Sequence, residues 1–130
     1  MKFFCVFVKS RKKFDKFVKV NAIKNKYIID VNRIIEEEEI VNFERDKSYI
    51  KVLILQKISL ALKNNKDIYY IPDLNNSFSI HKVLNIRHLL ERNDFNILLF
   101  YSEFRNDNVL LNDIIENLDN FDNSQIIRDY

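Results

Sequence analysis

The chain has 130 residues and none of them is glycine. Glycine lacks a Cβ atom, so it adopts positive φ angles easily and lets the backbone approach a ligand closely. A Walker A phosphate loop, a G-x-G-x-x-G dinucleotide turn and a G-x-S-x-G nucleophile elbow each depend on that freedom. The sequence therefore excludes most glycine-dependent nucleotide-binding and hydrolase motifs.

Average usage of about 7% predicts about nine glycines in a chain of this length. Ile, Lys, Asn, Phe and Tyr abound while Ala and Pro are scarce, which is typical of a gene from an A/T-rich genome. Many bacteriophages and some intracellular bacteria have such genomes, and we expect a bacteriophage protein. Asn and Asp tolerate the left-handed region best after glycine. We expect them to replace it at residues 64–65, 75–76 and 106–108.

Composition predicts one soluble globular domain, since 47% of the residues are hydrophobic and 31% are charged. We expect this domain to span residues 1–120 and a loosely held C-terminal tail to span 121–130, with Ile126 and Ile127 adding at most a small edge contact. The longest apolar runs, such as 97–101, are far shorter than the roughly 20 residues of a membrane span. We expect no membrane partner and a cytoplasmic location, in the host if the protein is viral, or else a place in the virion.

Apolar periodicity predicts alternating strands and helices. Strands are expected at 3–8, 27–31, 67–71 and 96–101, and helices at 11–20, from 46 or 48 to 63, from 77 or 79 to 92, and at 108–118. A polar crossing through 33–39 separates the second strand from the long helix. Parallel strands joined by right-handed helical crossovers predict an α/β fold, a three-layer sandwich with a mostly parallel sheet of about four strands.

Charge is unevenly distributed although the net charge is only +2. Residues 1–27 hold nine Lys and Arg against Asp15, a net of +8, so the rest of the chain carries −6. This polarity is compatible with an anion site, an acidic partner or head-to-tail association. Six cations cluster at the predicted start and along the face of the first helix, namely Lys9, Arg11, Lys12, Lys13, Lys16 and Lys19.

That basic segment has two interpretations, a nucleic-acid-binding surface or a solvated helix face. Phe14 and Phe17 interleave with the lysines, but they fall on the apolar stripe and are expected in the core, where they cannot stack on bases.

The spacing of the His, Cys and Glu side chains gives little support for a metal site or a catalytic nucleophile. The run Glu36–Glu39 is expected to be a solvated turn or helix start, and His81 and His88 are about 10 Å apart along one helix, too far to share a metal. Cys5, the one cysteine, lies within an apolar run and is expected to be a buried, inert thiol. We therefore expect no metal, no cofactor and no catalytic triad.

Three carboxylates, Asp30, Asp73 and Glu103, follow predicted strands near their carboxyl ends. Parallel α/β sheets bind ligands at that edge, which makes it the best place for a residual pocket. The alternative is that these side chains cap strand ends and form turns.

The order of elements resembles the P-loop kinases of the polynucleotide-kinase-like group over about residues 2–105. Residues 27–33, Tyr-Ile-Ile-Asp-Val-Asn-Arg, echo the family's second strand with its Asp and nearby Arg, here Asp30 and Arg33. Residues 71–77, Ile-Pro-Asp-Leu-Asn-Asn-Ser, echo the turn after the third strand, with Asn75 at the family's Asn. The family's preceding Asp is replaced by Pro72, unless Asp73 takes its place one residue late. The helix with Arg87 and the segment 95–104 complete the resemblance.

The phosphate loop is where the chain departs from that family. The family has Gly-x-x-Gly-x-Gly-Lys-Ser/Thr after its first strand, and this chain has Val-Lys-Ser-Arg-Lys-Lys-Phe at 8–14. A Walker A loop works through converging backbone N–H groups, a Lys on the phosphates and a hydroxyl on Mg²⁺. The resemblance thus implies a degenerate scaffold without catalysis. Its residual ligand pocket would consist of Lys12, Lys13, Asp30, Arg33, Asp73 and Asn75.

Three functions follow from these observations. The first is a non-catalytic interaction or assembly protein that binds a partner protein or its own copies. The second is a nucleic-acid-binding accessory protein that uses the basic segment 9–19. The third and least favoured is a residual nucleotide or polynucleotide kinase, which would need an unconventional phosphate site.

Overall fold

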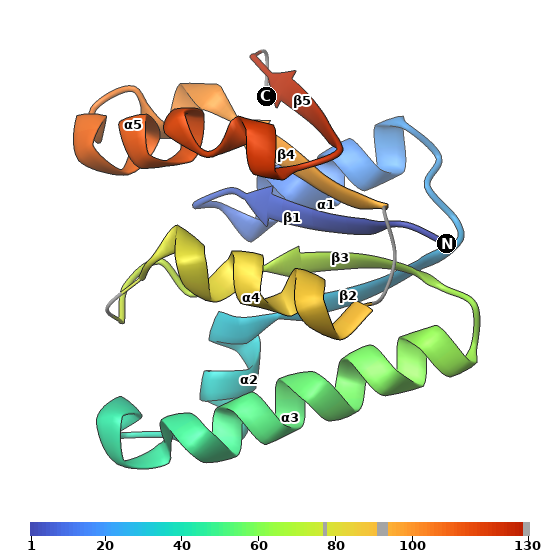
Figure 1. Cartoon of the computed structure of the whole chain (residues 1–130), viewed down its shortest axis with the longest axis vertical. Helices are drawn as coiled ribbons and strands as arrows, with labels where there is room; N and C mark the ends of the chain where they lie inside the picture. The colour runs from blue at the N-terminus through green and yellow to red at the C-terminus, as the bar shows by residue number, and fades with distance from the viewer. Residues whose placement is uncertain (77, 91–93, 129–130) are drawn as a thin grey trace.

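The computed structural model of the protein describes residues 1–76, 78–90 and 94–128, and Figure 1 shows how its strands and helices alternate. The strands are β1 (Phe3–Phe7), β2 (Lys26–Asp30), β3 (Asp67–Ile71), β4 (Phe95–Phe100) and β5 (Asn123–Ile127). The helices are α1 (Arg11–Val20), α2 (Val31–Glu37), α3 (Phe43–Lys63), α4 (Ile80–Leu90) and α5 (Asn108–Glu116), with 3₁₀ turns η1 (Tyr101–Phe104) and η2 (Leu118–Asn120).

The five strands form one parallel sheet in the order β2-β3-β1-β4-β5. β1 is central, as its apolar run predicts, and its Cys5 is level with Tyr70 of β3 and Ile97 of β4. The α/β class and the parallel sheet are confirmed. The expected count of about four strands is wrong, because the segment 123–127, which we placed in the tail, forms β5.

β5 was missed because only its last two residues, Ile126 and Ile127, are apolar, and four of its five side chains are exposed. Backbone pairing and Asp122 hold the strand instead. The backbone N–H of Asp122 donates to the carbonyl of Phe95 at 2.7 Å, and the Asp122 carboxylate accepts from the backbone N–H of Phe95 and from the guanidinium of Arg87, each at 2.8 Å.

The two faces of the sheet carry separate apolar clusters, which gives the fold three layers. On one face Val6 and Val8 pack with Phe14, Phe17 and Val18 of α1. On the other face the alternate residues of β1 pack with the other helices, in a cluster that includes Phe3, Cys5, Phe7, Ile34, Ile58, Ile80 and Ile114. The period-2 alternation of β1 thus supplies both cores.

Two helices differ from the sequence-based expectation because of capping side chains. α2 occupies the expected polar crossing, since the Asp30 carboxylate caps it by accepting from the backbone N–H of Arg33 at 3.4 Å. α3 begins at Phe43, earlier than expected, because the Asn42 side chain accepts from the backbone N–H of Arg45 at 3.0 Å. Ser77 and the expected helix end at Arg92 lie outside the described residues.

Three helices end in a left-handed residue that is not glycine. Ala22, Glu39 and Asn65 follow α1, α2 and α3 with φ angles of 50°, 53° and 54°. In each case the next residue donates its N–H to the carbonyl five residues back, as Ile23 does to Val18 at 3.1 Å, which is the Schellman arrangement. Asn65 was expected in this role. The described Asn and Asp residues of 75–76 and 106–108 do not adopt positive φ.

Candidate functional site

The carboxyl ends of β1, β2 and β3 meet at one edge of the sheet, where parallel α/β folds bind ligands. The chain leaves β1 toward α1 on one face, whereas it leaves β3 toward α4 on the other. This divergence opens the crevice that the strand-end carboxylates predicted.

A pocket of about 180 Å³ lies there, and it is smaller than the roughly 300–1,000 Å³ of sites for drug-sized ligands. It can hold several waters or a small anion. Its lining includes two of the predicted residues, Asp30 and Arg33, whereas Lys12, Lys13, Asp73 and Asn75 are not part of it. The lining residues are Val8, Lys9, Arg11, Asp30, Asn32, Arg33, Glu36 and Ile71.

The charges within the pocket are partly paired with one another. Arg11 Nη1 donates to Asp30 Oδ2 at 2.9 Å, and Arg11 Nε donates to Asp15 Oδ1 at 2.8 Å. Burial alone would lower the pKa of Arg11, but the hydrogen bonds to both carboxylates outweigh it and raise that pKa. Asp30 also caps α2, so this side chain positions two helices around the pocket.

Glu103 contacts the loop between β1 and α1, residues 8–10. Its carboxylate accepts from the backbone N–H of Lys9 at 3.0 Å and from that of Ser10 at 3.1 and 3.3 Å. Ser10 precedes α1 at the N-cap position, but its own side chain makes no capping bond. Amides before a helix are a natural site for an anion. Here a carboxylate of the same chain takes that position.

Asp73 forms a turn of its own. It is 8% exposed, and its two carboxylate oxygens accept from the backbone N–H of Asn75 at 2.9 Å and from the side-chain amide of Asn76 at 2.6 Å. The three strand-end carboxylates therefore all accept hydrogen bonds from backbone N–H groups, and of the three only Asp30 lines the pocket.

The basic segment lies mostly on the solvent side of α1. Lys9, Lys12, Lys16 and Lys19 are exposed, and Arg11 and Lys13 are half-buried. Lys9 lines the pocket, and its Nζ is 3.9 Å from Asp107 Oδ2 and lies over the ring of Phe104. Phe14 and Phe17 are buried, so the segment offers charge without aromatic stacking.

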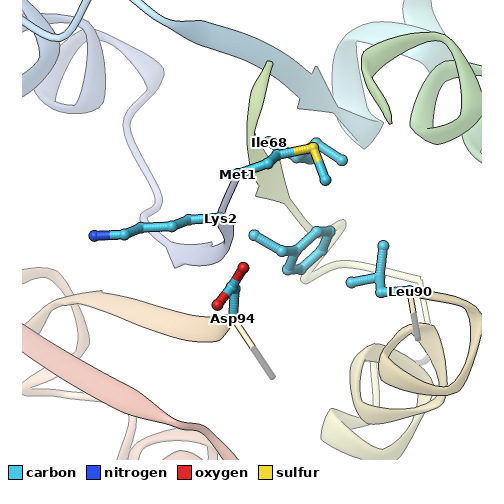
Figure 2. A pocket seen from close by; sticks show the side chains of 6 residues that line it. Met1, Lys2, Ile68, Leu90 and Asp94 are labelled. Carbon is cyan, nitrogen blue, oxygen red and sulfur yellow. The ribbon is translucent and has the colours of Figure 1, made fainter. Parts of the chain in front are cut away.

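A second, much smaller cavity lies at the amino ends of β1 and β3. Figure 2 shows Met1, Ile68 and Leu90 around it, together with Lys2 and Asp94. Its volume of about 10 Å³ is about that of one water probe. This space is a packing defect beside Phe3, at the opposite end of the strands from the pocket.

Metal chemistry gains no support from the described part of the chain, which holds no group of three His, Cys, Asp or Glu side chains able to bind an ion. His81 and His88 are both exposed on α4. Among the described helices none has the length and apolar character to cross a membrane.

Most residues of the pocket and of the Glu103 contact were predicted from the sequence, but their hydrogen-bond partners were not. It placed Arg11 in the basic segment and Glu103 at a strand end, but their partners lie 19 and 93 residues away in sequence. Asn32 and Glu36 were missed because α2 was not expected. The one available signal was Asp30 directly before Val31, an N-cap residue ahead of an apolar position.

No family model, curated protein or solved structure matches this chain. The resemblance to the polynucleotide-kinase-like group thus stays a prediction.

Proposed function

We propose that the protein is a non-catalytic interaction or assembly protein built on a degenerate kinase-like scaffold. The observation that supports this most directly is the contact of Glu103 with the N–H groups of Lys9 and Ser10. A phosphate-binding loop must present its amides to the nucleotide, and a carboxylate in that place repels phosphate.

The pocket supports the same proposal. At about 180 Å³ it is too small to enclose a nucleotide, and Arg11, one of its cations, is already bonded to Asp30 and Asp15. The alternation of strands and helices, with Asp30 at the end of β2 and Arg33 three residues later, is compatible with the proposed scaffold. We infer that the surfaces of this scaffold, rather than its pocket, carry the function.

The test is a thermal-shift titration with ATP and Mg²⁺, paired with a phosphate-release assay. We expect neither a shift in melting temperature nor release of phosphate. A magnesium-dependent shift, or phosphate release that Asp30→Ala abolishes, would contradict the proposal and favour the residual kinase. Glu116→Ala, at an exposed position of α5, is the matched control for that substitution.

Nucleic-acid binding is the second candidate, and the exposed lysines of α1 favour it. Fluorescence anisotropy with a short single-stranded oligonucleotide tests it at two salt concentrations. Binding should weaken in Lys12→Gln/Lys19→Gln and persist in Lys63→Gln/Lys66→Gln, whose cations lie at the end of α3. Equal binding by both double variants would count against this candidate.

A further inference from the structure

Helix α1 lies on the opposite face of the sheet from the other described helices. The apolar cluster on its face holds Phe14, Phe17 and Val18 of α1 together with side chains of the strands. Residues of α2, α3, α4 and α5 belong to the cluster on the other face. Figure 1 shows α1 behind the sheet and α4 in front of it. A large ligand can therefore reach α1 without meeting a second described helix.

The exposed side of α1 carries three lysines in one line. Lys12, Lys16 and Lys19 are exposed and follow one another at spacings of four and three residues. At 3.6 residues per turn they fall within an arc of about 60° and extend about 10 Å along the helix. Phe14 and Phe17 point the opposite way, into the core. We call Lys12, Lys16 and Lys19 the lysine ridge.

The acidic side chain beside the ridge is already paired. Asp15 is the one acidic residue of α1, and its Oδ1 accepts from Arg11 Nε at 2.8 Å. Arg11 also pairs with Asp30 at 2.9 Å. Lys13 on the same helix and the exposed Lys24 just after it add positive charge. The surface of α1 is therefore positive, and it complements a dense row of negative charges.

Aromatic side chains for stacking on unpaired bases are missing from this surface. Phe14 and Phe17 are buried, and among the described residues the one exposed aromatic side chain is Tyr49 of α3, on the other face. Proteins that bind single strands combine a positive groove with aromatic stacking platforms. A surface that offers charge alone favours the double helix, whose two strands together place one phosphate charge at about every 1.7 Å.

We propose that the lysine ridge binds double-stranded DNA through its phosphates, without reading the base sequence. An ammonium group acts as a point charge toward phosphate oxygens. A ridge of about 10 Å matches about three base pairs of the duplex. DNA suits a lone helix better than duplex RNA does, because the major groove of RNA is too narrow for a helix to approach.

This inference deepens the second candidate function, on which it rests, by naming the kind of nucleic acid. Fluorescence anisotropy of the full chain measures binding to a labelled DNA duplex and to each of its single strands over a range of salt concentrations. The duplex should bind more tightly than either strand. Three phosphate contacts predict that the logarithm of the association constant falls with the logarithm of the salt concentration with a slope of about −2.7. Duplexes of different base sequence should bind equally.

Substitution of the ridge tests its position. Lys12→Gln/Lys16→Gln/Lys19→Gln should lower the affinity for the duplex about tenfold or more at low salt and bring the salt slope close to zero. The matched control, Lys47→Gln/Lys51→Gln/Lys63→Gln, removes the same charge from exposed positions of α3, on the other face, and should bind as the wild type does. Circular dichroism of both triple variants establishes that they fold.

Several outcomes would overturn this inference and leave nucleic-acid binding in place. They are tighter binding to a single strand, tighter binding to a duplex RNA of the same length, dependence on base sequence, or the same loss of affinity in both triple variants. No binding to any of these nucleic acids would overturn the inference together with the second candidate function. None of these results affects the ATP test of the first proposal.

Discussion

Glu103 Oε2 accepts a hydrogen bond from the backbone N–H of Ser10 at 3.1 Å, and this bond joins η1 to the start of α1. Loss of the carboxylate would leave the N–H groups of Lys9 and Ser10 without their partner. We therefore expect Glu103→Ala to lower the free energy of unfolding by about 1–2 kcal/mol. Urea denaturation measures this, with Glu116→Ala on the exposed face of α5 as the control. Equal stability of the two variants would contradict the prediction.

The Asp30 carboxylate has two separable roles, because it pairs with Arg11 and caps α2. Asp30→Ala removes both the pair and the cap of α2, and we expect a loss of about 1–2 kcal/mol in the free energy of unfolding. Asn is also a good N-cap, so Asp30→Asn should retain most of the cap and lose only the charge pair. If Asp30→Asn lowers the free energy of unfolding as much as Asp30→Ala does, the cap of α2 contributes nothing to stability.

Asp122 should control whether β5 stays on the sheet. Asp122→Ala removes the bond to the N–H of Phe95 and the ion pair with Arg87, two of the side-chain contacts that fix this strand. We expect the amides of residues 123–127 to exchange hydrogen faster while those of β1 keep their protection. Asp119→Ala, three residues earlier, serves as the control. Unchanged exchange in β5 would show that backbone pairing with β4 suffices.

Alkaline pH should destabilise the protein through two buried acids. Burial raises the pKa of Cys5 above its ordinary 9.0, and burial, followed by the nearby Cys5 and Asp73, raises the pKa of Tyr70 above 10.0. The unfolded chain then loses these protons first, so stability is full below about pH 9 and falls as pH rises beyond it. Thermal melting of wild type and Tyr70→Phe isolates the tyrosine. The variant should lose less stability above pH 10.0, and identical profiles would refute its role.

Substitution by glycine should stabilise this protein at positions that hold a left-handed φ angle. Ala22 and Glu39 hold left-handed φ angles that cost about 1–2 kcal/mol in a residue with a Cβ atom. Allowing for the entropy of glycine in the unfolded chain, Ala22→Gly and Glu39→Gly should each raise the free energy of unfolding by about 0.5–1 kcal/mol. Ser59→Gly, in the exposed interior of α3, should lower it by about 0.5 kcal/mol. A lower free energy of unfolding in all three variants would contradict the prediction.

The strands and α1 were predictable because their signals are local. Apolar runs define β1, β3 and β4, and the spacing of Phe14, Phe17 and Val18 defines α1, whose observed bounds match the expected ones. α2 and β5 depend on contacts that hydrophobic periodicity does not encode. Asp30 caps α2. Asp122 holds β5 by accepting a hydrogen bond from Phe95 of β4, which lies 27 residues earlier in the sequence.

The pocket was predictable only in part, for a related reason. The carboxyl ends of strands indicate where a site lies, and Asp30, which was predicted on that ground, lines the pocket together with Arg33, which only the family resemblance had indicated. The sequence does not indicate that Glu103 reaches across 93 residues to the amide of Ser10. That contact, which most affects what the loop can bind, exists only once β1 and β4 are paired.

The central position of β1 has a consequence for synthesis of the protein on the ribosome. β1 is made first, yet its two neighbours in the sheet are β3 and β4, which end at residues 71 and 100. The nascent chain therefore carries the apolar segment Phe3–Phe7 without any strand partner until β3 has been made, and without its second partner until β4 follows. During that interval this segment is the part of the chain most prone to aggregation, and the one that a chaperone would shield first.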